Sequence, residues 1–83
     1  LEDIKFNKEI VERVKYNLPS MNYALDCGAG IGRVTKTLLS NYFLYTDLVE
    51  PCKHFIDKAK EELKDLPKIK NGRKARNYYI KGL

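Results

Sequence analysis

The chain has 83 residues, of which 16 are lysine or arginine and 11 are aspartate or glutamate, so its formal net charge is +5. This length suits one small domain and argues against a complete two-domain enzyme, because a chain so short buries only about 60% of its unfolded surface. A hydrophobic content of 43% with 33% charged residues argues against disorder. No apolar run approaches the ~20 residues of a membrane-spanning helix, and we see no secretory leader. Because the chain opens at Leu1, we expect it to be a piece of a longer protein.

Cysteine and histidine are too sparse for a disulfide framework or a structural zinc site. Cys27 and Cys52 do not have the spacing of a Cys-x-x-Cys pair, and His54 is the only histidine. We therefore expect no metal and a reducing compartment, cytoplasmic or nuclear.

The positive charge is concentrated near the end of the sequence. Residues 1–63 contain nine basic and ten acidic residues, whereas residues 64–83 contain seven basic residues and one acidic residue. Such a segment is either a solvated connection or a nucleic-acid-binding patch. We favour the connection, because no pattern of aromatic residues for base stacking interleaves the lysines.

Hydrophobic spacing and turn signals predict helices that alternate with strands. In chain order, we expect a helix at residues 7–18, a strand at 21–27, a glycine turn at 28–32, a helix at 33–39, a strand at 43–49, a helix at 51–66, a polar loop at 68–74 and a strand at 76–81. This alternation is typical of βαβ units around a parallel sheet. Three strands are half of a usual doubly wound sheet, and an exposed strand edge would allow dimerisation or strand swapping.

The segment from Asp26 to Arg33, which reads DCGAGIGR, joins the first strand to the next helix. Glycines allow a sharp turn and a close approach of a ligand to the backbone at the carboxyl end of a parallel strand, where open α/β sheets bind ligands. The amide groups at the start of the following helix could also face that ligand.

The spacing narrows the choice of ligand. A dinucleotide fingerprint requires a third glycine where this chain has Arg33, and the P-loop pattern is absent. Glu50 follows Gly28 by 22 positions and could accept hydrogen bonds from both ribose hydroxyls. Arg33 could pair with a carboxylate and Asp26 could lie near an ammonium group, so a nucleoside with an amino-acid end fits best.

These residues resemble motifs of a known family. The segment from Ala24 to Lys36, ALDCGAGIGRVTK, is similar to the first glycine motif of the protein N-terminal methyltransferases, which are class I enzymes that use S-adenosyl-L-methionine. They methylate the α-amino group of proteins that begin X-Pro-Lys. The DLVEP segment that ends at Pro51 resembles the second strand with its acidic end, and residues 76–83 resemble the third strand.

The resemblance implies an α/β, partial Rossmann-like class I methyltransferase fold with an incomplete parallel sheet, in which residues 1–83 are the N-terminal cofactor-binding half. It implies that Gly28 lies against the amino-acid part of S-adenosyl-L-methionine, that Arg33 pairs with its carboxylate and that Glu50 binds the ribose. The complete set of implied cofactor-binding residues is Gly28, Gly30, Arg33, Glu50, Pro51, Cys52, Gly82 and Leu83.

Two of these positions depart from the family pattern. Glu50 stands where the family usually has aspartate, and Pro51 stands where an aliphatic residue is usual. Pro51 and Cys52 would line the adenosine, and Gly82 and Leu83 would contact the adenine ring.

The implied activity is methylation of the α-amino group of a protein N-terminal peptide, which would bind mostly outside this chain. No residue here is assigned as a catalytic base, so we expect no turnover from this chain alone. The alternatives are another class I methyltransferase, a basic nucleic-acid-binding module and, more weakly, a dinucleotide-dependent oxidoreductase.

Overall fold

The computed structural model describes residues 2–15, 18 and 20–82. Its elements follow the predicted alternation of helices and strands. In chain order they are α1 (Glu2–Val14), β1 (Tyr23–Cys27), α2 (Arg33–Thr37), the 3₁₀ helix η2 (Leu39–Asn41), β2 (Tyr45–Val49), α3 (Lys53–Leu63), α4 (Leu66–Ile69) and β3 (Lys74–Tyr79).

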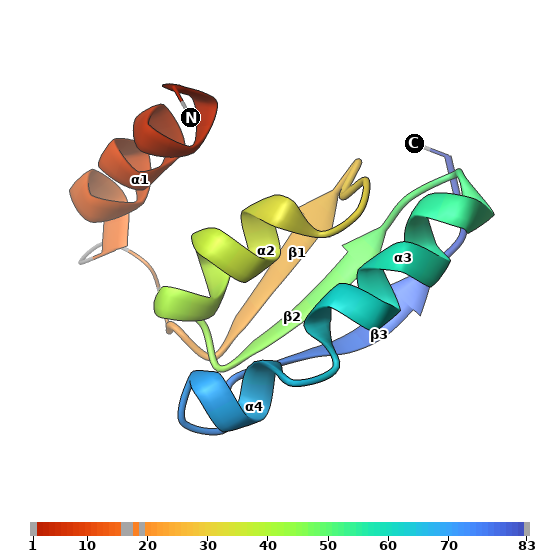
Figure 1. Cartoon of the computed structure of the whole chain (residues 1–83). Helices are drawn as coiled ribbons and strands as arrows, with labels where there is room; N and C mark the ends of the chain where they lie inside the picture. Colours follow the sequence, from red (N-terminus) through yellow and green to blue (C-terminus); the bar gives the residue numbers. More distant parts are fainter. Residues whose placement is uncertain (1, 16–17, 19, 83) are drawn as a thin grey trace.

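The three strands form one parallel sheet in the order β1-β2-β3, as the alternation predicted. Cys27 at the end of β1 pairs with Val49 at the end of β2, and Val49 pairs with Tyr79 at the end of β3. The loops that follow β1 and β2 therefore emerge side by side at one edge of the sheet. Helices α2 and α3 both cover the same face (Figure 1).

The hydrophobic core lies between this face of the sheet and the helices. Leu48 of β2 is fully buried, and Ile56, Ala59 and Leu63 present one side of α3 to the core. Their spacing of three and four residues is the helical period, which predicts this face from the sequence. The same pattern places Phe55 on this face, but Phe55 is 48% exposed, so that part of the prediction was wrong.

The opposite face of the sheet is largely uncovered in the described part of the chain. Tyr23, Leu25 and Cys27 of β1 point to this face and are exposed, whereas Asp26 points toward the helices and is buried. The short apolar segment at residues 21–27 is typical of a buried strand, and the exposure of these three side chains shows that this interpretation was wrong. Helix α1 lies to one side of the sheet rather than across this face (Figure 1).

Several predicted helix boundaries also need correction. Helix α1 begins at Glu2 rather than at Asn7, since no glycine or proline in that segment stops it, and it ends at Val14 rather than at Leu18. Pro67 does not follow the end of a longer α3. It occupies the first turn of α4, where a missing N–H costs no hydrogen bond.

Candidate functional site

The glycine turn between β1 and α2 uses the left-handed backbone region that glycine tolerates best. Gly28, Gly30 and Gly32 have φ angles of 69°, 59° and 85°. A Cβ atom on Gly28 or Gly30 would meet no atom within 4 Å, so both residues border open space. A Cβ atom on Gly32 would lie 2.8 Å from Cδ1 of Leu63. The first two glycines thus leave room for a ligand, and the third allows α2 to pack against α3.

Hydrogen bonds fix this turn to the end of β2. The N–H groups of Gly28 and Ala29 donate to the carbonyl oxygen of Val49 at 2.8 Å and 3.0 Å. Oε1 of Glu50 accepts a hydrogen bond from the N–H of Gly30 at 2.9 Å, and Oε2 accepts one from the N–H of Cys52 at 2.8 Å. The structure therefore brings the glycine turn and Glu50 together, as their positions after neighbouring strands predicted.

Glu50 is 7% exposed, and each of its carboxylate oxygens accepts a single hydrogen bond from the described part of the protein. A carboxylate offers about four acceptor positions, so further donors can bind the same group. Paired hydroxyls of a ribose are suitable donors. The open side of Gly28 and Gly30 provides adjacent space, so the residues present fit a nucleoside.

The other predicted site residues lie in the segments that follow the three strands. Arg33 is the first residue of α2, is exposed, and has no ion-pair partner within the described residues. Pro51 is exposed, and Cys52, whose side chain is half-buried, is the N-cap of α3. Gly82 is exposed three residues after the end of β3.

Two further points limit the predicted site. Leu83 lies outside the described residues, so its adenine contact stays a prediction. Helix α2 has only five residues, so we assign no ligand to the backbone N–H groups at its amino-terminal end.

Asp26 lies beneath the glycine turn and fastens α2 to β1. Its Oδ2 accepts a hydrogen bond from the Thr35 hydroxyl at 2.7 Å, and both residues are buried. Burial raises the pKa of Asp26 despite the opposing effect of hydrogen bonds from Thr35. Its contact with a ligand ammonium group stays a prediction.

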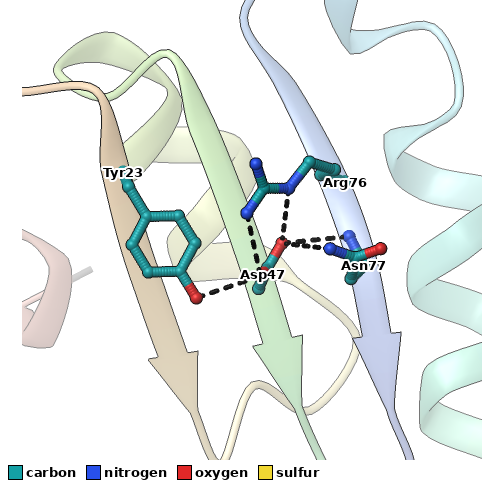
Figure 2. A network of polar contacts seen from close by, with 4 residues as sticks. All are labelled: Tyr23, Asp47, Arg76 and Asn77. Carbon is teal, nitrogen blue, oxygen red and sulfur yellow. Dashed lines mark hydrogen bonds and ion pairs between the residues drawn. The ribbon is translucent and has the colours of Figure 1, made fainter.

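A polar network that the site predictions missed occupies the face of the sheet away from the helices. It centres on Asp47 of β2, and Figure 2 shows Tyr23, Arg76 and Asn77 directed toward the Asp47 carboxylate. Burial acts to raise the pKa of Asp47, but hydrogen bonds from these three residues outweigh it and leave the pKa lowered. The sequence signal for this network is Asp47, an acidic residue inside a predicted strand. A carboxylate that is buried in a sheet requires hydrogen-bond partners.

Several cations of the basic segment have partners within the chain. Lys64 pairs with Glu61, Lys70 donates to Asn41, and Arg76 pairs with Asp47. These contacts leave fewer free cations for a nucleic acid than the composition alone indicates.

Neither a cluster of metal-ligating side chains nor a membrane-spanning helix occurs among the described residues. No group of three or more histidine, cysteine, aspartate or glutamate side chains within them could bind a metal ion. None of their helices has the length and apolar character that crossing a membrane requires.

A glycine turn after one parallel strand, hydrogen-bonded to an acidic residue after the next, is the arrangement of a Rossmann-like nucleoside-binding domain. The family model described as AdoMet dependent proline di-methyltransferase matches residues 2–83. The chain belongs to this family of methyltransferases, and its fold is the partial Rossmann-like fold predicted from the sequence.

Individual relatives agree with this assignment. The chain is 49% identical over 57 residues to alpha N-terminal protein methyltransferase 1 of Oryza sativa subsp. indica, covering 68% of this chain and 19% of the relative. It is 38% identical over 84 residues to N-terminal Xaa-Pro-Lys N-methyltransferase 1 of Bos taurus, covering 98% of this chain and 35% of the relative.

A solved structure supports the fold. A SAM-dependent methyltransferase from Leishmania major superposes with a TM-score of 0.73 at 36% identity, covering 96% of this chain and 29% of that one. The chain thus spans 19% to 35% of the length of these three proteins.

Proposed function

We propose that this chain binds S-adenosyl-L-methionine as the cofactor-binding half of a protein N-terminal methyltransferase. The acceptor in this proposal is the α-amino group of a protein that begins X-Pro-Lys. The observation that carries the proposal is the Glu50 carboxylate hydrogen-bonded to Gly30, within a chain of the methyltransferase family. The names of the Oryza and Bos relatives support the choice of acceptor.

The residues of the site have distinct roles in this proposal. Gly28 and Gly30 leave the space for the amino-acid part of the cofactor, and Arg33 supplies a cation for its carboxylate. Glu50 accepts hydrogen bonds from the ribose hydroxyls. Pro51, Cys52 and the segment after β3 border the adenosine. The cofactor supplies an electrophilic methyl group to the amine, and we assign no proton transfer to the residues of this chain.

The experiment is a methylation assay on the full protein with a synthetic Xaa-Pro-Lys peptide, read by mass spectrometry. We expect a mass increase of the peptide that is lost when its α-amino group is acetylated beforehand. Methylation of the acetylated peptide, or of a lysine side chain only, would contradict the α-amine and favour another class I methyltransferase. Salt-dependent binding to RNA without a response to S-adenosylhomocysteine would favour a nucleic-acid-binding module.

The same assay tests the extent of the proposed half-domain. We expect the isolated 83-residue chain to show no turnover, and measurable turnover would contradict that part of the proposal. We also propose a cytoplasmic or nuclear location, which the free, exposed Cys27 supports because thiols persist in reducing compartments.

A further inference from the structure

Strand β3 contains a bulge directly opposite Asp47. Thr46 pairs with Ala75, but Leu48 pairs with Tyr78, so β3 has one residue more than β2 between these two pairs. A bulge of this kind interrupts the ladder and leaves a peptide group that needs another partner.

Asp47 supplies that partner through its side chain. Its Oδ1 accepts a hydrogen bond from the backbone N–H of Asn77 at 3.1 Å and another from Asn77 Nδ2 at 3.2 Å. The guanidinium of Arg76 donates to both carboxylate oxygens at 3.3 Å, and the Tyr23 hydroxyl donates to Oδ2 at 3.0 Å (Figure 2). The Asp47 side chain is only 5% exposed, so this charged acceptor is largely removed from water.

The bulge sets the register of the last residues of β3. Beyond it, Tyr78 packs against the core under the helices, and Tyr79 pairs with Val49. The N–H of Glu50, the first residue after β2, donates to the carbonyl oxygen of Tyr79 at 2.9 Å. Because side chains alternate along a strand, loss of the extra residue would move Tyr78 to the opposite face.

We propose that Asp47 is a positioning residue for the adenosyl site, because its carboxylate holds the β3 bulge that sets the backbone of Glu50 and of residues 80–82. This inference rests on the proposed cofactor site. Asp47 itself lies on the far face of the sheet and does not contact the cofactor. It acts through the pairing of β2 with β3.

The test measures coupling between Asp47 and the ribose hydroxyls. Full protein and its Asp47→Asn variant are titrated by calorimetry with S-adenosylhomocysteine and with an analogue that lacks both hydroxyls. In the unaltered protein we expect removal of the hydroxyls to weaken binding by about tenfold or more. In Asp47→Asn we expect weaker binding of S-adenosylhomocysteine and a clearly smaller loss on removal of the hydroxyls, because Glu50 is displaced.

Tyr23→Phe is the matched control. It removes one hydrogen bond to the same carboxylate and leaves the bulge contacts in place, so we expect both affinities to stay within about twofold of the unaltered protein. A variant that only lowers the stability of the fold would not change the ratio of the affinities for the two ligands. A folded Asp47→Asn protein with the full hydroxyl effect would overturn the inference and leave the cofactor site standing.

A second measurement covers the case in which Asp47→Asn does not fold. Hydrogen exchange is followed at the amides of Asn77 and Glu50 in the unaltered protein and in Arg76→Gln, which removes the counter-charge of Asp47. We expect faster exchange at both amides, and unchanged exchange at Glu50 would overturn the inference. This measurement needs no ligand, so its result bears on the inference alone. Failure of the proposed function would show separately, as absence of S-adenosylhomocysteine binding to the unaltered protein.

Discussion

The carboxylate of Glu50 and the backbone N–H of Gly30 are joined by a 2.9 Å hydrogen bond, although the two residues are 20 positions apart in the chain. This contact places an acidic group beside a turn in which Gly28 and Gly30 border open space, at the carboxyl ends of two parallel strands. A cofactor with a ribose and an amino-acid end requires both features at one place.

Substitution of Glu50 tests the ribose contact. In Glu50→Gln, the side-chain amide can still accept the Gly30 N–H, but its NH₂ group cannot accept that of Cys52. We expect affinity for S-adenosylhomocysteine to fall by about tenfold or more, as is usual for hydrogen bonds to a charged group. Calorimetric titration measures the change, and Glu62→Gln on the exposed side of α3 is the matched control. Equal affinity of Glu50→Gln and the unaltered protein would count against a ribose contact.

Substitution of Arg33 tests the other end of the cofactor. We expect Arg33→Ala to weaken binding of S-adenosylhomocysteine by several fold while leaving binding of adenosine unchanged, because adenosine lacks the carboxylate. Lys36→Ala is the control on the same helix, since Lys36 already pairs with Glu62 at 3.1 Å. An equal loss for both ligands in Arg33→Ala would argue that Arg33 supports the fold rather than the carboxylate.

The contact between Gly32 and Leu63 predicts a stability difference between two glycines. Both Gly32→Ala and Gly72→Ala place a side chain at a positive φ angle, which costs about 1–2 kcal/mol. Only the first also brings a Cβ atom within 2.8 Å of Leu63, and such overpacking adds about 1–3 kcal/mol. Urea denaturation measures both variants. If the two lose the same free energy of unfolding, the close packing of α2 against α3 at Gly32 is refuted.

The opposite pKa shifts of Asp26 and Asp47 predict opposite effects of pH on stability. The raised pKa of Asp26 means that the free energy of unfolding falls as pH rises from the ordinary aspartate range through the raised value. The lowered pKa of Asp47 means that its contribution is complete above that ordinary range and is lost as pH falls through the lowered value.

Denaturation over a series of pH values separates the two groups. We expect Asp26→Asn to remove the decline of stability above the ordinary aspartate range. We expect Asp47→Asn to lower stability at neutral pH and to reduce the loss in acid. The same pH profile in Asp26→Asn and in the unaltered protein would refute the assignment for Asp26.

The sequence predicted those features of the fold that depend on local pattern and spacing. The helical period of Ile56, Ala59 and Leu63 identified the core side of α3, and Gly28 with Glu50 located the edge of the sheet where the turn and the acid meet. The resemblance to a family added the roles of these residues, which spacing alone does not specify.

Features that depend on tertiary contacts were not predicted. The bulge at Asn77 exists because a side chain from another strand accepts its N–H, and no local signal marks it. The exposure of Leu25 depends on which elements cover the sheet, and alternation along β1 does not specify that. The helical turn that begins at Leu66 was missed because proline was read as the end of a helix, although it is equally suited to the first turn of one.

The most direct measurement is a crystal structure of the full protein with S-adenosylhomocysteine. The proposed site predicts both ribose hydroxyls within hydrogen-bond distance of the Glu50 carboxylate, with the amino-acid end beside Gly28 and Gly30. A ribose bound elsewhere, with Glu50 bonded only to Gly30 and Cys52, would contradict it.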